Sequence, residues 1–491
     1  MKRNYDNTPP FAASIIESLR AFGYDLSTAI ADLVDNSISA GAKNIYINFV
    51  WNGDKSIAYV IDDGCGMSLK ELIEAMRFGS KSPLAKRPAK DLGRFGLGLK
   101  TASLSQCRRM TVFTKNKKGL TYIRCWDLDV ISSSIKGEWK LLRDADELGN
   151  HYLSKLEDRK SGTLVLWQNL DRLTRNFRLN NEKHHDIFLD KIKKVEIHLG
   201  MVFHRLMSGS DPVKIFINDK LIKSWDPYME DHIATLALSS DIIKIGSSKI
   251  IVQPYILPHF TKLTDAQYEL GSGPKGWLAQ QGFYIYRNDR LLVAGDWLDQ
   301  SIAKEEHLKL GRISIDLPNT VDSEWQLDVT KSRATPPPEL RPDLNRISEI
   351  IREKARSVYS YRGVNAIERK NTELNFIWNI KIKHNKTFYK INTKHPLIVK
   401  LREEISSKSV FDSLLKIIEQ TIPVEHIAFV STQKPDLLPR AFEDKSDDEI
   451  KFSMLPIFDS LLKKGLSRED SKAIIANIHP YDNFLHIVNT L

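Results

Sequence analysis

The stretch that decides the fold is AIADLVDNSISAGA, residues 29–42. Its apolar residues recur at helical spacing, which predicts an amphipathic helix. In a helix, positions i and i+4 share a face, so we expect Asp32 and Asn36 to point the same way. A carboxylate there can orient a water molecule, and a carboxamide oxygen can ligate Mg²⁺. Taken alone, the stretch is better explained as an acidic helix face with a solvated Asn.

Three further motifs follow along the chain. IDDGCGM, residues 61–67, comes directly after a predicted strand; its glycines let a flat ligand approach the backbone, and Asp62 can accept from an exocyclic amine. GRFGLGLKTAS, residues 93–103, opens a helix and would present backbone amides to phosphate oxygens. SGT, residues 161–163, begins another strand. Each motif alone fits an ordinary turn, but the four in this order indicate one nucleotide pocket.

Composition narrows the class of protein. The 491 residues are 42% hydrophobic and 27% charged, enough for roughly three domains with cores of their own. Three cysteines without a C-x-x-C pair exclude a disulfide scaffold and a cysteine-based zinc cluster. A formal charge of +10 is compatible with nucleic acid without requiring it. No long apolar stretch is present, so we expect a soluble, cytoplasmic protein with no membrane partner.

Periodicity and turn residues predict the remaining elements. After the first helices, the predicted strands are 44–50, 57–61, 110–114, 122–127, 162–167, 213–217, 249–257, 282–287 and 312–317. The predicted later elements are helices at 99–105, 184–207 and 340–358, a hairpin at 376–392, and helices near 403–420, 447–464 and 467–478. Residues 79–98 resemble a lid more than a packed element. The strand at 213–217 is expected to open the second domain.

These motifs resemble those of the GHKL superfamily of ATPases, which includes gyrase B, the ninety-kilodalton heat-shock chaperone, histidine kinases and MutL. AIADLVDNSISAGA resembles the N box, IDDGCGM the adenine box, FGSKS with GRFGLGLKTAS the lid and phosphate box, and SGT the last box. The set is most similar to the Morc-like branch, prokaryotic relatives included. More loosely, QGFYIYRNDR, residues 281–290, and LDVTKSR, residues 327–333, resemble the transducer domain that follows the ATPase in MutL, topoisomerases and Morc proteins.

The expected α/β fold has three parts, and the resemblance covers the first two. Residues 1–208 would form a GHKL (Bergerat) ATPase α/β sandwich. Residues 209–362 would form a transducer-like (ribosomal S5-type) α/β domain ending in a long helix. Residues 363–491 carry no such resemblance; we expect there a mixed α+β C-terminal region of unknown role, where a partner protein could bind.

The resemblance also assigns roles to single residues. Asp32 would act on the attacking water, Asn36 would hold Mg²⁺, and Asp62 would bind the adenine amine. Lys331 would reach the γ-phosphate from the second domain, as a catalytic residue. The other residues expected around ATP are Gly64, Gly66, Met67, Lys81, Gly93, Gly96, Leu97, Gly98, Lys100, Thr101 and Thr163.

One position departs from the family pattern. The family usually has Glu four residues before the Asn, whereas this chain has Asp32, which is shorter by one methylene. We therefore expect slow hydrolysis, since small displacements of a general base reduce the rate.

The function implied by the resemblance is an ATP-gated clamp that dimerises through its ATPase domain on ATP binding. Its client would be double-stranded DNA, in genome maintenance or in defence against foreign DNA, antiviral defence included. A chaperone-like protein-remodelling ATPase and a non-hydrolysing nucleotide-sensing scaffold for partner proteins are the alternatives.

Overall fold

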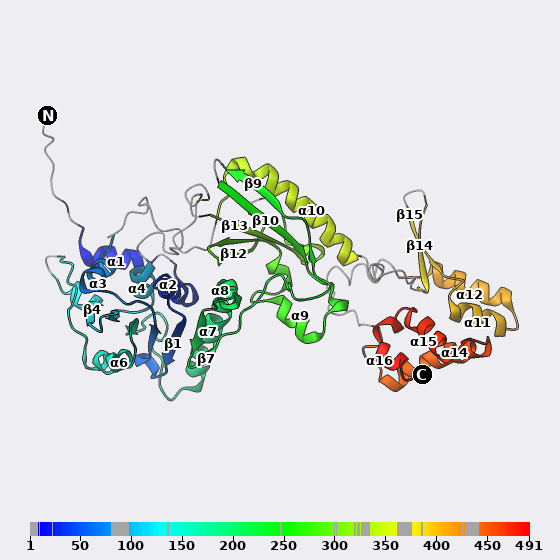
Figure 1. The fold of residues 1–491 in the computed structure, drawn as a ribbon, viewed down its shortest axis with the longest axis horizontal. Helices are drawn as coiled ribbons and strands as arrows, with labels where there is room; N and C mark the ends of the chain where they lie inside the picture. The colour runs from blue at the N-terminus through cyan, green and yellow to red at the C-terminus, as the bar shows by residue number, and fades with distance from the viewer. Residues whose placement is uncertain are drawn as a thin grey trace. The chain divides into compact units, whose positions relative to one another are not determined.

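The structure is a computed structural model that divides into two compact units, Met1–Ala355 and Arg356–Leu491 (Figure 1). The residues that it describes are 8, 10–21, 23–79, 98–134, 137–245, 248–298, 300, 302–318, 321, 325, 334–360, 376–383, 386–423, 427 and 441–491. None of the helices within these ranges is long and apolar enough to cross a membrane.

The first unit begins with a seven-stranded sheet in the order β4-β3-β5-β2-β1-β6-β7. Its strands are β1 Asn44–Val50, β2 Ile57–Asp62, β3 Arg109–Lys115, β4 Thr121–Asp127, β5 Gly162–Gln168, β6 Lys214–Ile217 and β7 Lys220–Leu221. Neighbouring strands are antiparallel except for β1 and β6, which are parallel. The pairing of β6 with β1 corrects one expectation: the strand predicted to open the second domain belongs to the first sheet.

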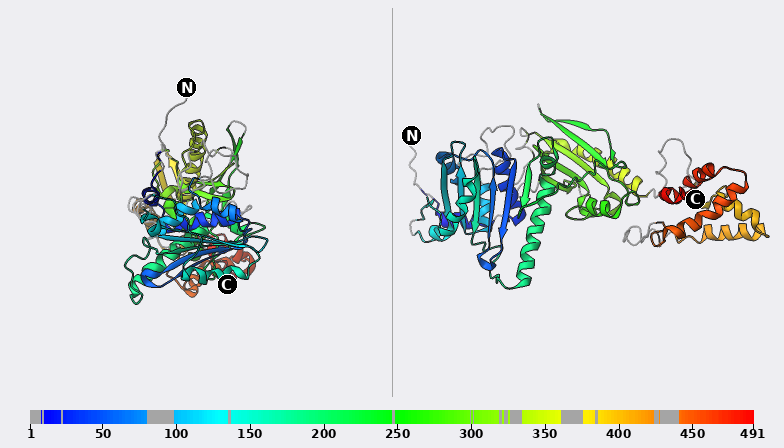
Figure 2. Two further views of the ribbon diagram at one scale, coloured as in Figure 1. Left: turned by 90° about the vertical axis from the view of Figure 1, so that its left-hand side faces the viewer. Right: turned by 60° about the horizontal axis from the view of Figure 1, so that its bottom comes forward.

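Helices cover both faces of this sheet, as Figure 2 shows from two sides. They are α1 Ala12–Arg20, α2 Leu26–Ser39, α3 Leu69–Met76, α4 Gly98–Gln106, α5 Leu128–Ser132, α6 Glu147–Glu157, α7 Glu182–Val202 and α8 His204–Ser208. Helix α2 packs against α4 and α7 in the larger hydrophobic cluster, and α6 packs on the opposite face, where Tyr152 and Leu156 are buried with Tyr59. The result is the predicted α/β sandwich.

The middle strand β2 explains why this core forms. All six residues of IAYVID are buried, because helices lie on both of its faces. A continuously apolar strand of this kind is typical of a sheet that is covered on both sides. Asp62 is the last residue of this apolar strand, so its carboxylate lies at the end of β2, at the edge of the hydrophobic core.

A second sheet completes the first unit, in the order β12-β11-β13-β10-β8 with β9 paired to β10. Its strands are β8 Leu236–Ala237, β9 Asp241–Ile245, β10 Ser248–Ile256, β11 Gly282–Arg287, β12 Arg290–Asp296 and β13 Gly311–Leu317. The helices beside it are α9 Asp265–Ser272 and α10 Arg341–Ser360. A Cβ built on Gly311 of β13 would lie 2.7 Å from Ile351, so α10 packs closely on this sheet. The amphipathic helix expected at 340–358 is thus present.

Short 3₁₀ turns connect several of these elements. They are η1 Gly53–Lys55, η2 Phe260–Lys262, η3 Trp277–Gln280, η4 Glu306–Leu308, η6 Pro338–Leu340 and, in the second unit, η9 Tyr481–Asn483.

The second unit combines one hairpin with a group of helices. Its elements are β14 Trp378–Lys383, β15 Lys386–Ile391, α11 Pro396–Glu404, α12 Lys408–Gln420, α14 Asp447–Lys463, α15 Arg468–Ala476 and α16 Leu485–Val488. The hairpin and the two last long helices agree with the sequence. The helix expected near 403–420 is α12 alone, because Ile405 has extended backbone and ends α11.

Candidate nucleotide-binding site

The Asp62 carboxylate is the point where three of the sequence motifs meet. Asp62 is only 5% exposed. Its Oδ2 accepts from the Ser37 hydroxyl at 2.9 Å. Its Oδ1 accepts from the backbone N–H of Gly64 at 2.9 Å and of Thr163 at 3.2 Å. Ser37 belongs to α2, Gly64 to the loop after β2 and Thr163 to β5, so residues distant in sequence hold one carboxylate.

Burial raises the pKa of Asp62, and the hydrogen bonds from Gly64, Ser37 and Thr163 oppose that shift. These three donors use only part of the acceptor capacity of the carboxylate, since each oxygen carries two lone pairs. Asp62 can therefore accept one more hydrogen bond, as an exocyclic amine would require.

Glycines allow the backbone to close around this carboxylate. A Cβ on Gly162 would lie 2.2 Å from the Asp62 carbonyl oxygen, and one on Gly64 would lie 2.9 Å from Ala40 Cβ. Gly66 has a φ of +62°, and a Cβ there would lie 2.0 Å from the Lys115 carbonyl oxygen. Backbone segments approach one another too closely at these positions for any larger residue.

Hydroxyl groups connect the loop after β2 to β3 and β5. The Met67 N–H donates to Thr114 Oγ1 at 2.9 Å, and that oxygen lies 3.2 Å from Thr163 Oγ1. The Ser161 hydroxyl donates to the Gly64 carbonyl at 2.7 Å. Thr114 thus links the loop that contains Met67 to Thr163 of β5, beside the Asp62 end.

Asp32 occupies the other end of the site, nearer the start of α2. It is 4% exposed, and its Oδ2 accepts from the Tyr24 hydroxyl at 2.8 Å. A Cβ built on Gly98 would lie 3.1 Å from the same oxygen, so the first residue of α4 lies against this carboxylate. The N-terminus of a helix carries partial positive charge, which suits both a carboxylate and phosphate oxygens.

Tyr24 acts as a fixed hydrogen-bond donor to Asp32. Burial, the charge of Asp32 and the hydrogen bond to it raise the pKa of Tyr24 well above its ordinary value, while a hydrogen bond with Thr101 lowers it. Its backbone carbonyl accepts from Gln106 Nε2 at 3.0 Å. Both ends of α4 therefore hold Tyr24 in place, and Thr101 is buried beside it.

Asn36 differs from its neighbours in α2 because its side chain is exposed. The described residues contain no group of three or more His, Cys, Asp or Glu side chains able to hold a metal by themselves. A single carboxamide oxygen fits Mg²⁺, which in nucleotide sites takes most of its ligands from phosphates and water.

Lys100 is buried, and its expected contact with phosphate stays a prediction. It is 2% exposed, and its ammonium donates to the Ala75 carbonyl at 2.8 Å, near the end of α3. Lys81, Gly93, Gly96, Leu97 and Lys331 lie outside the described residues.

Four residues of the site were not singled out from the sequence. They are Tyr24, Asp35, Ser37 and Arg290. Ser37 carried one usable signal, a small hydroxyl residue on the buried side of a predicted helix. Tyr24 and Arg290 carried none in isolation, because their partners lie 8 and 255 positions away.

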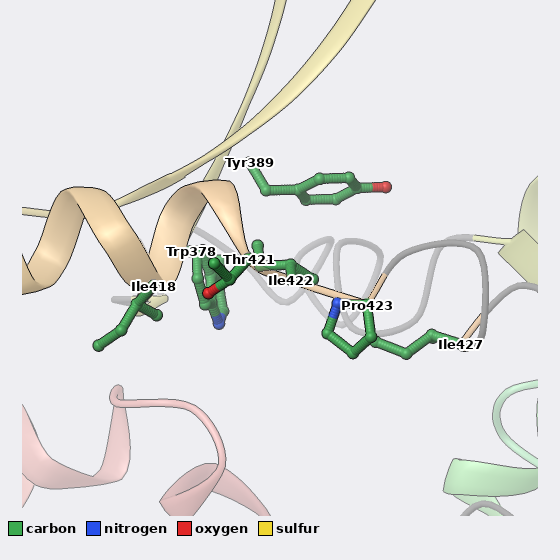
Figure 3. A pocket seen from close by; sticks show the side chains of 7 residues that line it. All are labelled: Trp378, Tyr389, Ile418, Thr421, Ile422, Pro423 and Ile427. Atoms are coloured by element: carbon green, nitrogen blue, oxygen red, sulfur yellow. The ribbon is translucent and has the colours of Figure 1, made fainter.

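The second unit has a separate hollow of about 450 Å³ between the hairpin and the end of α12 (Figure 3). Mostly apolar side chains line it, and they are Trp378, Tyr389, Ile418, Thr421, Ile422, Pro423 and Ile427. It contains none of the residues that the motifs predicted.

Comparison with known proteins agrees with this geometry. Residues 24–163 match the family described as "Histidine kinase-, DNA gyrase B-, and HSP90-like ATPase". This stretch begins at Tyr24 and ends at Thr163, so it contains both ends of the site. Residues 24–163 form a GHKL domain. The predicted resemblance to this superfamily is confirmed.

Relatives of the GHKL domain include Morc and MutL proteins, as the motifs indicated. The chain is 29% identical over 188 residues to ATPase morc-1 of Caenorhabditis elegans, covering 32% of this chain and 22% of that protein. It is 34% identical over 99 residues to the human MORC family CW-type zinc finger protein 1, covering 19% and 10%. It is 29% identical over 111 residues to the DNA mismatch repair protein MutL of Syntrophotalea carbinolica, covering 22% and 17%. The match spans less than a quarter of each relative.

A solved structure, the N-terminal domain of a DNA repair protein, aligns with a TM-score of 0.42 and 16% identity. It covers 70% of this chain and 97% of that one.

Proposed function

We propose that this chain is a Mg²⁺-dependent ATP-binding switch that hydrolyses ATP slowly. The observation that carries the proposal is the Asp62 carboxylate, buried and held by donors from three separate motifs. Such a fixed acceptor beside glycine-rich backbone suits the amine edge of adenine, and the family match of residues 24–163 supports the same ligand.

Hydrolysis would take place at the Asp32 end. Asp32 would accept a hydrogen bond from the attacking water. The Tyr24 hydroxyl, which donates to Asp32 Oδ2, would keep the carboxylate oriented. Asn36 would hold Mg²⁺, which when bound neutralises charge on the triphosphate. The N-terminus of α4 would stabilise phosphate oxygens through its backbone amides.

The rate is proposed to be low because Asp32 is shorter than the family's usual Glu. A general base contributes about 10²–10⁴-fold to a rate, and a displaced base contributes less. Turnover above roughly one per second, the lower end of typical enzyme rates, would contradict this part of the proposal.

ATP binding would close the lid, bring two protomers together through their ATPase domains, and close a clamp on double-stranded DNA. The names of the relatives support DNA as the client, since MutL is a DNA mismatch repair protein. The net charge of +10 agrees with it. Lys331 would couple the γ-phosphate to the second domain, and hydrolysis would reopen the clamp. Genome maintenance or defence against foreign DNA are the proposed settings.

The experiment that tests this is ATP turnover by the full chain with and without plasmid DNA. Asp32→Ala and Asn36→Ala should abolish turnover, whereas Ser39→Ala, an exposed position on the same helix, should not change it. Light scattering with a non-hydrolysable ATP analogue should show a dimer that is absent without nucleotide.

The outcomes separate the alternatives. A rate of ATP turnover that rises when plasmid is added supports the DNA clamp, provided that the stimulation becomes smaller at higher salt concentration. Stimulation by a heat-denatured reporter protein and not by plasmid would favour the protein-remodelling ATPase. Binding of ATP without turnover would favour the nucleotide-sensing scaffold.

A further inference from the structure

The second sheet contacts helix α2 through one buried ion pair. Arg290, the first residue of β12, places its Nε 2.8 Å from both carboxylate oxygens of Asp35. The two side chains are 5% and 2% exposed. Asp35 immediately precedes Asn36 and follows Asp32 by less than one turn of α2. The pair therefore joins the second sheet directly to the segment that carries Asp32, the proposed catalytic residue, and Asn36, the proposed Mg²⁺ ligand.

Arg290 is held firmly from its own side. It follows a two-residue turn, Asn288 and Asp289, whose φ values of 48° and 61° are those of a tight type I′ hairpin. Its Nη1 donates to the Leu291 carbonyl at 3.1 Å, and its guanidinium lies 5.7 Å from the centre of the Phe203 ring. Because the hairpin is short and the guanidinium is packed, a displacement of the second sheet would move Arg290 and, through it, Asp35.

Two other polar contacts of α2 are with residues of the first sheet and its loops. Asp32 accepts from Tyr24, and Ser37 donates to Asp62, so each fixes the helix relative to the nucleotide pocket. Arg290, by contrast, reaches α2 from the second sheet. Stability alone is a weak reason for such a pair, because replacing a buried ion pair by apolar residues often costs nothing. Control of position is the better explanation.

We propose that Arg290 is a positioning residue for the reaction at α2. Acting through Asp35, it sets the rotation of the helix and hence the placement of Asp32 and Asn36. The inference rests on the proposed function and adds to it a route between the second domain and the site that does not pass through Lys331. Because two of the three donors to Asp62, Gly64 and Thr163, lie outside α2, loss of Arg290 affects turnover and leaves the affinity for ADP unchanged.

The test compares Arg290→Gln and Asp35→Asn with a matched control, Arg205→Gln. Arg205 of α8 also binds the second sheet, donating to Asp316 at 2.5 Å and to Ser314 at 2.8 Å, and its hydrogen bonds and ion pairs among the described residues do not involve α2. All variants are made in the full chain. The measurements are kcat, KM, the Kd for ADP, the melting temperature, and hydrogen exchange of residues 26–39.

Arg290→Gln should lower kcat by about 10- to 100-fold, the effect of a misplacement of roughly 1 Å, while KM and the ADP Kd remain unchanged. Hydrogen exchange in α2 should rise in this variant. Asp35→Asn should behave in the same way, and Arg290→Lys should recover part of the rate because it keeps the charge. Arg205→Gln should lower the melting temperature without changing kcat.

Three results overturn the inference. If Arg290→Gln retains the wild-type kcat, or if kcat falls equally in Arg205→Gln, Arg290 has no positioning role and only the inference fails. If the wild-type chain binds ADP but never turns over ATP, the proposed hydrolysis fails and takes the inference with it.

Discussion

The two ends of the nucleotide site are built in different ways. At the Asp62 end, the partners are Ser37 of α2 and the backbone amides of Gly64 and Thr163, which belong to the first sheet and its loops. At the α2 end, the helix that carries Asp32 is also held by Arg290 of the second sheet. The contacts of Asp62 thus stay within the first sheet and its helices, whereas α2 also depends on the second sheet.

This difference suggests that the two ends have different roles. The end that recognises the base should not depend on the conformation of the rest of the molecule, because binding comes before hydrolysis. The end at which ATP is hydrolysed should depend on that conformation if the protein is a switch, because a switch requires an element whose arrangement changes the reaction. Substitutions at Asp62 should therefore change affinity, and substitutions around α2 should change turnover.

The largest expected effect comes from a crossed pair of substitutions. Asp32→Asn should lower kcat by about 10²–10⁴-fold, the usual contribution of a general base, and leave the ADP Kd unchanged. Asp62→Asn should weaken ADP binding by roughly 10- to 100-fold, because its amide presents a donor to the adenine amine where an acceptor is needed. Isothermal titration and steady-state kinetics measure the two effects.

Both substitutions conserve size, so the fold should survive them. Equal losses of affinity and of turnover in both variants would contradict the separation of the two ends. A melting temperature far below that of the wild type in either one would mean that folding, not chemistry, was measured.

A smaller effect should follow from closing the space beside Gly66. Gly66→Ala places a Cβ 2.0 Å from the Lys115 carbonyl oxygen, so the loop after β2 must move and weaken ADP binding by about 10-fold or more. Gly119→Ala is the matched control, because it has a φ of +79° and nothing within 4 Å of the added Cβ. Both should lose about 1–2 kcal/mol from the left-handed backbone alone.

ADP titration and thermal melts of the two glycine variants provide the check. If Gly66→Ala binds ADP as tightly as Gly119→Ala does, the packing of this loop does not shape the pocket.

A modest effect should follow from removing one hydroxyl. Tyr24→Phe deletes the donor to Asp32 and keeps the ring, so kcat should fall by about 3- to 10-fold, the worth of one hydrogen bond. The ADP Kd should not change. Tyr46→Phe is a suitable control because Tyr46 stacks on Phe216 at 4.8 Å, away from α2. An unaltered kcat in Tyr24→Phe would show that Asp32 needs no such support.

The sequence predicted the Asp62 end better than the α2 end, for a physical reason. Asp62, Gly64 and Gly66 lie in one short loop after an apolar strand, so their chemistry and spacing are visible together. The first sheet followed from the same alternation of strands and turns. The error at β6 arose because its parallel partner, β1, lies 170 positions earlier, and a strand of four residues carries no sign of its neighbour.

The contacts of α2 were harder to foresee. From the sequence alone, Asp35 is one more acidic residue on a helix that could be exposed. Its partner Arg290 lies 255 positions later in the chain, so the ion pair could not be predicted from local spacing. Lys100 illustrates a second limit: a lysine after a glycine-rich stretch suggested a phosphate contact, and the spacing gave no sign that its ammonium also donates to the Ala75 carbonyl. Motif spacing predicts which backbone is close to a ligand, but the direction of a long side chain depends on tertiary packing.

The last expected effect is on stability and not on turnover; it concerns the contact between α8 and the second sheet and depends on pH. His204 of α8 lies 2.8 Å from the Tyr286 hydroxyl of β11, and burial, with the charge of Arg205, lowers its pKa from 6.5 to about 3. A base with a depressed pKa stabilises the fold fully above its unfolded value and loses that contribution as the pH falls. The free energy of unfolding should therefore decrease between pH 6.5 and about 3. Burial raises the pKa of Asp62, so protonation of Asp62 favours the folded state as the pH falls and partly offsets the loss at His204.

Comparing the wild type with His204→Gln isolates the contribution of the histidine. The free energy of unfolding of the variant should decrease less on acidification than that of the wild type. Parallel curves of melting temperature against pH for the two proteins would contradict a neutral His204 beside Tyr286.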